Sequence, residues 1–200
     1  CIGVGNGGDA LELALRACSI GVGDEVILPT NSFAATAMSV QRIGAIPHFV
    51  DPRESDFLIN PEILSTIIGK KTKAIVPVHL FGQMANMQEI SSIAKQHGLK
   101  LIEDGAQSQG ALQNNQNPGM FSDAVATSFY PGKNLGAFGD AGAVTTNDPL
   151  IAERIKQLRN YGGIKKYEHV VPEIDIGEVT DRMQLILREL LDQLFQTGGS

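Results

Sequence analysis

The chain has 200 residues, which is enough for one domain with a sizeable hydrophobic core. Its apolar content of 42% and charged content of 19% are ordinary for a globular protein. The net charge of -6 and the pI near 5.2 argue against a nucleic-acid-binding protein, which would carry a basic surface. No apolar run approaches the roughly 20 residues of a membrane span, so we expect no membrane partner.

The two cysteines, Cys1 and Cys18, are isolated in the sequence. This spacing indicates neither a disulfide framework nor a metal site. Cys18 falls on the apolar face of a predicted helix, so we expect it in the core. Without a visible secretory signal, the reducing cytoplasm is the expected location.

Short apolar runs alternate with amphipathic segments along most of the chain. In chain order, the patterns predict helix 10–20, strand 25–28, helix 33–43, strand 46–50, helix 61–68, strand 73–78, helix 87–97, strand 99–103, strand 124–129, strand 141–145, helix 149–160 and helix 178–195. This alternation predicts an α/β fold in three layers, with a mostly parallel sheet and helices on both faces.

Cap signals mark the expected helix starts. Asp9 with Glu12 predicts the first helix, and Asn86 with Glu89 predicts the helix at 87–97. In such a sheet, ligands bind beyond the carboxyl ends of the strands, so the residues that follow each strand are the candidate site residues.

Lys133 is the most distinctive of these candidates. It lies in Ser128-Phe-Tyr-Pro-Gly-Lys-Asn134, between two predicted strands, and glycines follow at 136, 139 and 142. The ordinary interpretation is a solvated surface charge. The functional interpretation is an amine that forms a Schiff base with an aldehyde and then moves protons.

Asp104 and Gln107 follow the apolar strand at 99–103. Asp104 is either a buried turn residue or a carboxylate that keeps the nitrogen of a pyridine ring protonated. Gln107 is either a solvated helix residue or a donor to a phenolic oxygen. Both alternatives stay open on the residues alone.

The glycine-rich segment from Gly3 to Asp9 precedes the first helix. Its amides could hold a phosphate at the helix N-terminus, or the segment could be a turn with no ligand. It also fits the dinucleotide pattern G-x-G-x-x-G, although the strand that should precede that pattern is essentially absent.

Three further residue types have structural interpretations. Phe33 is either a core aromatic or a ring stacked on a planar cofactor. His79 ends an apolar strand, and we expect a hydrogen-bonded structural histidine. Met84 and Met87 are expected to pack in the core.

Taken in order, several motifs resemble those of the DegT/DnrJ/EryC1/StrS family of pyridoxal phosphate (PLP)-dependent sugar aminotransferases. They are Gly7-Gly8-Asp9, Phe33, Glu103-Asp104-x-x-Gln107, the segment from Ser128 to Asn134, and Gly139-x-x-Gly142-Ala-Val-Thr-Thr-Asn147. The likeness runs from about Ile2 to Lys166. It implies the large domain of a fold type I PLP-dependent transferase at 1–166, followed by a divergent helical segment and tail at 167–200, with the family's small domain absent.

The resemblance also implies roles for residues of the site. Lys133 would be the catalytic Schiff-base lysine, Asp104 the partner of the pyridinium nitrogen, and Gln107 the contact to the phenolic oxygen. Phe33 would stack on the ring, while Ser128 and the amides of Gly8 and Asp9 would hold the phosphate. The implied substrates are an amino-acid donor, usually glutamate, and a nucleotide-linked keto-sugar, and the implied assembly is a homodimer.

Two differences from the family pattern are visible. Asn6-Gly7-Gly8 stands where the family has Ser-Gly-Thr, so one hydroxyl contact is lost, and the family's later Asn-Ser-Arg segment is not found. The alternative hypotheses are an inactive fragment that serves as a scaffold or binding domain, and a nicotinamide-binding domain.

Overall fold

The computed structural model describes residues 1–165 and 168–169. The chain divides into two compact units, Cys1–Arg159 and Asn160–Ser200. In the second unit, strands β8 (Gly163–Lys165) and β9 (Glu168–His169) form an antiparallel pair. The helix predicted at 178–195 lies outside the described residues, and the domain boundary at 166 stays a prediction.

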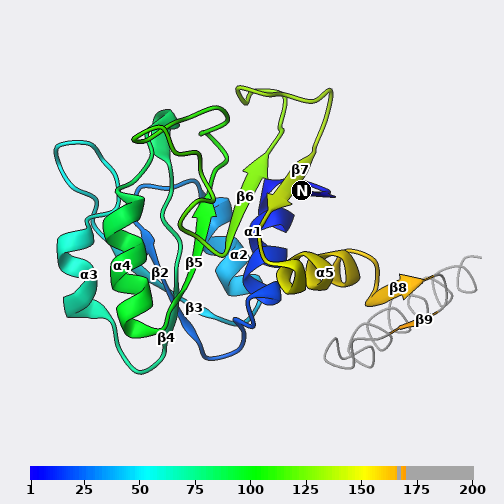
Figure 1. The fold of residues 1–200 in the computed structure, drawn as a ribbon, viewed down its shortest axis with the longest axis horizontal. Coiled ribbons are helices and arrows are strands. Elements are labelled where there is room, and N and C mark those ends of the chain that lie inside the picture. The colour runs from blue at the N-terminus through cyan, green and yellow to red at the C-terminus, as the bar shows by residue number, and fades with distance from the viewer. Residues whose placement is uncertain (166–167, 170–200) are drawn as a thin grey trace, which may run out of the picture. The chain divides into compact units, whose positions relative to one another are not determined.

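The first unit is built on one seven-stranded sheet in the order β1-β7-β6-β5-β4-β2-β3 (Figure 1). The strands are β1 (Ile2–Val4), β2 (Glu25–Pro29), β3 (Ile46–Val50), β4 (Thr72–Ile75), β5 (Lys100–Asp104), β6 (Ala124–Ser128) and β7 (Gly142–Thr145). β7 runs antiparallel to both of its neighbours, and the remaining strands of the sheet share one direction. The prediction of a mostly parallel sheet is confirmed.

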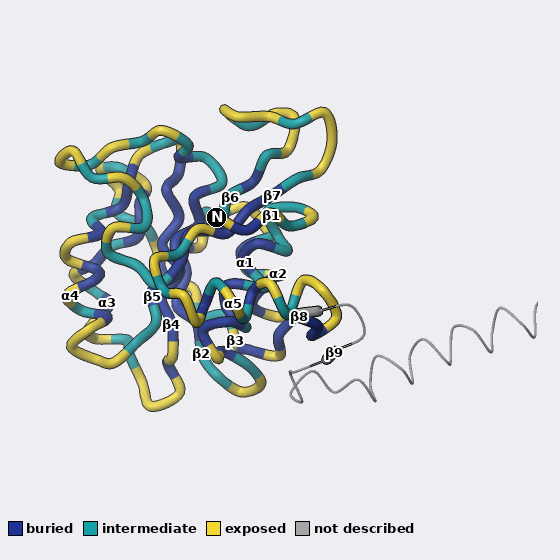
Figure 2. Tube along the Cα trace, turned by 45° about the vertical axis from the view of Figure 1, so that its right-hand side comes forward, coloured by how far each residue is buried: buried dark blue, intermediate teal, exposed yellow. Residues whose placement is uncertain are grey.

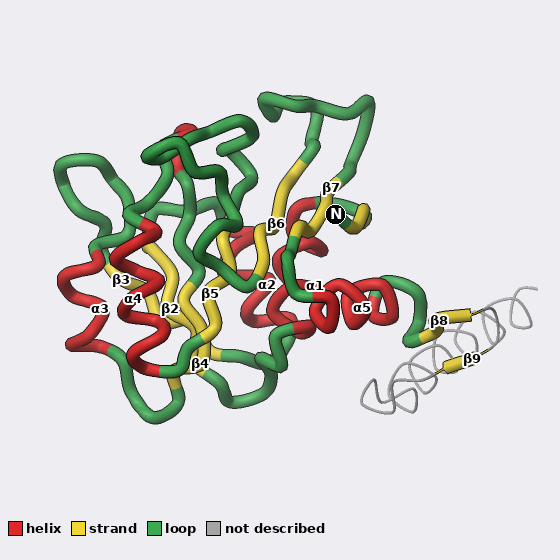
Figure 3. Tube along the Cα trace, viewed as in Figure 1, coloured by secondary structure: helices red, strands yellow, loops and turns green. Residues whose placement is uncertain are grey.

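Helices cover both faces of this sheet, with the strands between two helical layers (Figures 1 and 3). They are α1 (Gly7–Ala17), α2 (Ala34–Arg42), α3 (Pro61–Ile67), α4 (Met87–His97) and α5 (Pro149–Leu158), with a short 3-10 turn η1 (Leu80–Gly82). α1, α2 and α5 contribute to the core on one face, while α3 and α4 pack on the other.

The two cores follow from the alternation of side chains along each strand. In β2, Val26 and Leu28 point into the core under α1, and Ile27 points into the core under α3 and α4. The inner strands are accordingly buried along most of their length, whereas the edge strands β1 and β3 have one buried residue each (Figure 2). Cys18, Met84 and Met87 are buried, so the interpretation of all three as core residues is confirmed.

Most predicted elements lie within a few residues of the observed ones, but the start of the chain differs. A strand, β1, precedes the first helix, and the expectation that such a strand is essentially absent was wrong. α1 begins at Gly7 rather than at Ala10, and Asn6 rather than Asp9 is its N-cap. Glycine has a low helix propensity, which hid the first turn in the sequence.

No helix among residues 1–165 and 168–169 is long and apolar enough to cross a membrane.

Candidate functional site

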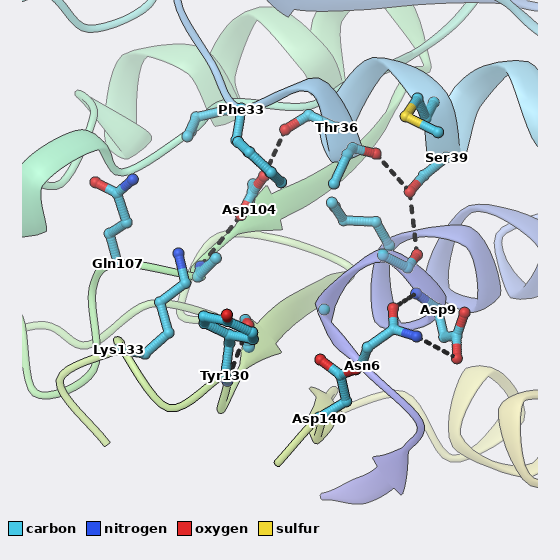
Figure 4. Close-up of a pocket in the computed structure, with 18 of the residues that line it drawn as sticks. Asn6, Asp9, Phe33, Thr36, Ser39, Asp104, Gln107, Tyr130, Lys133 and Asp140 are labelled. Carbon is cyan, nitrogen blue, oxygen red and sulfur yellow. Dashed lines mark hydrogen bonds between the residues drawn. The ribbon is translucent and has the colours of Figure 1, made fainter. Parts of the chain in front are cut away.

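A cavity of about 680 Å³ lies at the carboxyl ends of β5 and β6. The sequence-predicted site residues all line it, although they come from four separate segments of the chain: Gly8, Asp9, Phe33, Asp104, Gln107, Ser128 and Lys133. Figure 4 shows the side chains of Phe33, Asp104, Gln107 and Lys133 around the same space. The fold therefore brings together groups that the sequence places up to 125 positions apart, from Gly8 to Lys133.

Asp104 is the last residue of β5, and only 5% of its surface is exposed. The hydroxyl of Thr36 donates a hydrogen bond to Oδ2 at 2.8 Å, and the N–H of Ala106 donates to Oδ1 at 3.1 Å. Burial raises the pKa of the Asp104 carboxyl, and these two hydrogen bonds oppose that rise. Each carboxylate oxygen has a further lone pair, so Asp104 can still accept a hydrogen bond from a group in the cavity.

Lys133 lies in the loop between β6 and β7, where its backbone N–H donates to the carbonyl of Tyr130 at 2.8 Å. That bond forms a turn, which fixes the direction in which the lysine leaves the backbone. The side chain is half-buried and lines the cavity on the side of Gln107 and Tyr130 (Figure 4). An amine in this position can reach a carbonyl group held in the cavity.

Gln107 lies in a turn after β5 rather than in a helix, so its interpretation as a solvated helix residue was wrong. Its Oε1 accepts the backbone N–H of Phe81 at 2.7 Å. Phe81 adopts a left-handed conformation with φ of 58°, which directs that N–H at the glutamine. Because the carbonyl oxygen is engaged, the NH₂ group is the part of the side chain that can donate toward the cavity.

Phe33 is the N-cap residue of α2, and 76% of its surface is exposed. The interpretation as a core aromatic was therefore wrong. The ring lies on the α2 side of the cavity near Asp104 (Figure 4). An apolar ring face beside a buried carboxylate suits a flat aromatic ligand with a protonated nitrogen.

The N-terminus of α1 forms the opposite wall. The Asn6 side chain accepts the N–H of Asp9 at 2.8 Å, which caps the helix, and donates to the Asp9 carboxylate at 2.9 Å. The amide of Asp9, which was predicted to bind phosphate, is thus already occupied. The amide of Gly8 belongs to the first turn, where helix N–H groups have no partner within the helix.

Two close backbone approaches shape this wall. A Cβ on Gly7 would lie 2.7 Å from the Cβ of Ser128, and one on Gly142 would lie 2.4 Å from the carbonyl oxygen of Asn6. Both glycines therefore allow α1 to begin directly against β6 and β7. This brings the helix N-terminus and the Ser128 hydroxyl to one end of the cavity, where an anion would be favoured.

His79 is fully buried and does not line the cavity. Its Nδ1 accepts the N–H of Ala85 at 3.2 Å, and its Nε2 lies 2.5 Å from Oε2 of Glu103. Glu103 also accepts from the N–H of Gly119 and the hydroxyl of Ser122. The prediction of a structural, hydrogen-bonded histidine is confirmed.

The sequence reasoning missed several residues that line the cavity, among them Thr36, Ser39, Arg42, Tyr130 and Asp140. The sequence could have indicated Thr36, because it lies three positions after Phe33 on a predicted helix and so shares its face. It could not have indicated Asp140, since the loop around Asp140 has no periodic pattern.

Residues 1–185 match the model of the DegT/DnrJ/EryC1/StrS aminotransferase family. The erythromycin biosynthesis sensory transduction protein EryC1 of Saccharopolyspora erythraea is 50% identical over 171 residues, which cover 86% of this chain and 47% of that protein. The dTDP-3-amino-3,4,6-trideoxy-alpha-D-glucose transaminase of Streptomyces venezuelae is 47% identical over 168 residues, covering 84% of this chain and 44% of the relative.

Among solved structures, NtdA of Bacillus subtilis with bound cofactor PMP superimposes with a TM-score of 0.81 at 37% identity, covering 85% of this chain and 39% of that one. The chain thus spans about half the length of the curated relatives it matches. The family model, the identities and the fold agree, and this chain belongs to the DegT/DnrJ/EryC1/StrS aminotransferase family.

Proposed function

We propose that this chain is the cofactor-binding part of a PLP-dependent aminotransferase. The enzyme moves an amino group from an amino acid, with glutamate as the first candidate donor, to a nucleotide-linked keto-sugar. One observation carries the proposal: the amine of Lys133, the carboxylate of Asp104 and the amide of Gln107 share a single cavity. Family membership supports the reaction class, because the family is PLP-dependent.

The residues present fit this cofactor. The buried carboxylate of Asp104 matches the ring nitrogen, the NH₂ of Gln107 matches the phenolic oxygen, and the exposed ring of Phe33 matches the face of the pyridine. The hydroxyl of Ser128 and the backbone amide of Gly8, in the first turn of α1, match the phosphate. For the Asp9 amide itself to bind phosphate, its bond to Asn6 must open.

When bound, PLP supplies an electron sink that stabilises negative charge at the substrate carbon. The protein supplies the proton transfers and the positioning. Lys133 would hold the cofactor covalently through its amine and, once that amine is free, would move a proton between the substrate carbon and the cofactor. Asp104 would pair with the protonated ring nitrogen, and its two hydrogen-bond donors favour the ionised form of the carboxyl against the effect of burial. Phe33 limits the movement of the ring.

The proposed substrates follow from the relatives. The S. venezuelae relative is described as a transaminase of a dTDP-linked amino sugar, and a 45% identical relative from Acidithiobacillus ferrooxidans as a UDP-N-acetyl-3-dehydro-alpha-D-glucosamine 3-aminotransferase. We extend to this chain the class of nucleotide-linked keto-sugars, a homodimeric assembly and a cytoplasmic location. Polysaccharide biosynthesis is the corresponding proposed context.

The decisive test is covalent labelling. Addition of PLP should produce a visible absorption band, and borohydride reduction followed by peptide mass spectrometry should locate the pyridoxyl group on Lys133. Lys133→Arg keeps the charge but removes the reactive amine, so the label should disappear. Lys100→Arg is the matched control, because Lys100 is engaged with Asp123 at 2.7 Å and lies away from the cavity.

The second candidate is a folded fragment that serves as a scaffold or binding domain without turnover. The coverage of about half of each relative motivates it. It requires folded protein that takes up no label, or a label distributed over other lysines, and either result would reject the aminotransferase proposal for this chain. A nicotinamide-binding domain is less favoured, because Gly3 and Gly5 of the glycine pattern line a separate cavity from Gly8.

A further inference from the structure

The hydroxyl of Thr36 makes a long-range bond. Threonine hydroxyls in helices can bond to a carbonyl three or four residues earlier in the same helix. Ser39, one turn later in α2, does so, with its Oγ 2.7 Å from the carbonyl oxygen of Ala35. Thr36 instead donates to Asp104, 68 positions away in the sequence, and both groups are buried.

This bond joins two elements that carry different parts of the site. Thr36 lies in the first turn of α2, three residues after the N-cap residue Phe33, and no hydrogen bond from a side chain caps that end of the helix. Asp104 ends β5. The bond therefore fixes the start of α2 against the end of the strand, and with it the exposed ring of Phe33 (Figure 4).

We propose that Thr36 is a positioning residue for the cofactor site: its hydroxyl holds the Asp104 carboxylate in one orientation and ties the helix that carries Phe33 to the strand that carries Asp104. This inference rests on the proposed function for its biological meaning. Its physical content, the effect of Thr36 on Asp104, is a property of the protein without cofactor.

The chain offers a closely matched control in Thr72. Its surface is 3% exposed against 1% for Thr36, and its hydroxyl donates to the carboxylate of Glu25 at 2.7 Å against 2.8 Å for the bond to Asp104. Thr72 begins β4 and does not line the cavity. A Thr→Val substitution at either position removes one buried hydroxyl from one carboxylate with little change of shape, and at Thr72 it also removes the acceptor of the Gly69 N–H.

The first measurement uses the protein without cofactor. A ¹³C NMR titration of aspartate-labelled protein follows the Asp104 carboxyl, whose signal is assigned by its loss in Asp104→Asn. Lys133 and His79 are the charged or titratable neighbours that act on this carboxyl, and all variants retain them. Thr36→Val should move the Asp104 titration to higher pH, because the ionised form loses a donor, while Thr36→Ser and Thr72→Val should not.

The second measurement is the equilibrium affinity for PLP. Thr36→Val should bind PLP about tenfold more weakly, which corresponds to about 1.4 kcal/mol. Thr36→Ser should stay within about threefold of wild type, and Thr72→Val within about twofold. If Thr36→Val does not fold, Thr36→Ala replaces it with the same expected shift and loss.

The outcomes separate the two proposals. An Asp104 titration and a PLP affinity that are unchanged in Thr36→Val would overturn the role of Thr36. Wild-type protein that binds no PLP would overturn the proposed function, and the titration of the cofactor-free protein would still decide whether Thr36 controls Asp104.

Discussion

Asp104 illustrates at the scale of one residue how the site is built at the expense of stability. Because burial raises the pKa of this carboxyl in the folded state, the folded protein binds its proton more tightly than the unfolded chain does. The stability linked to Asp104 is therefore fully present below the unfolded pKa, near 3.9, and is lost as the pH rises through the higher folded pKa. At neutral pH the buried carboxyl therefore costs folding free energy.

We predict that Asp104→Asn stabilises the cofactor-free protein at pH 7. The amide can still accept from Ala106 and can donate to the Thr36 hydroxyl, so both contacts survive without the buried charge. The expected gain in Tm is about 2–4 °C, the shift that about 1 kcal/mol produces in a protein of 150–250 residues. Calorimetry at pH 7 and at pH 3.5 checks this, because the gain should shrink at the lower pH. A lower Tm at pH 7 would contradict it.

Residues of the site differed in how well the sequence predicted them. Lys133 and Asp104 were predictable, because each follows an apolar strand and parallel strands end at one edge of the sheet. The exposure of Phe33 was not predictable, since an aromatic residue at a helix start has the same local sequence pattern whether it packs in the core or faces a cavity. The engagement of the Asp9 amide depends on Asn6, which lies outside the helix that the sequence predicted.

At the scale of elements, the contact between α1 and β7 depends on the absence of a side chain at Gly142. A Cβ there would lie 2.4 Å from the carbonyl oxygen of Asn6, a backbone atom that cannot move without displacing the N-cap of α1. Gly142→Ala should therefore destabilise the protein by about 1–3 kcal/mol, the usual cost of overpacking. It should also weaken PLP binding, because the displaced helix start forms one wall of the cavity.

Gly3→Ala is the matched control for this substitution. Gly3 lies in the neighbouring strand β1, and a Cβ there would meet no atom within 4 Å. Urea unfolding of both variants should show the loss of stability in Gly142→Ala alone. Equal midpoints for the two variants would mean that the close approach of α1 to β7 is not a constraint in solution.

The same elements explain what the sequence could predict about the fold. Helix α4 was predictable at both ends, because Asn86 caps it and Gly98 follows in a left-handed conformation. The order of the strands was not, since the pairing of β1 with β7 joins the start of the chain to residues about 140 positions later and has no local signal. The antiparallel direction of β7 is likewise set by its loop from β6 and by its tertiary partners.

At the scale of the whole molecule, the first compact unit ends at Arg159, where helix α5 completes the core beside α1. Ile151 and Ile155 of this helix are buried, and the Arg159 side chain donates to the carbonyl of Gly3 at 2.7 Å. The described part of this core needs no residue beyond α5. The unit should therefore fold by itself, with a boundary a few residues before the one at 166 that the family resemblance implies.

A pair of truncations tests this boundary. The chain 1–160 keeps α5 and should melt cooperatively within about 3 °C of the full chain, a shift equivalent to about 1 kcal/mol or less in a protein of this size. The chain 1–148 lacks α5, so it exposes the apolar surface under Ile151 and Ile155. Burying two such side chains contributes about 3–6 kcal/mol, a large fraction of the stability of a typical domain, so 1–148 should show no cooperative transition by circular dichroism. Loss of the cooperative transition in 1–160 as well would mean that residues beyond Asn160 belong to the folding unit. A cooperative transition in 1–148 would mean that α5 does not belong to it.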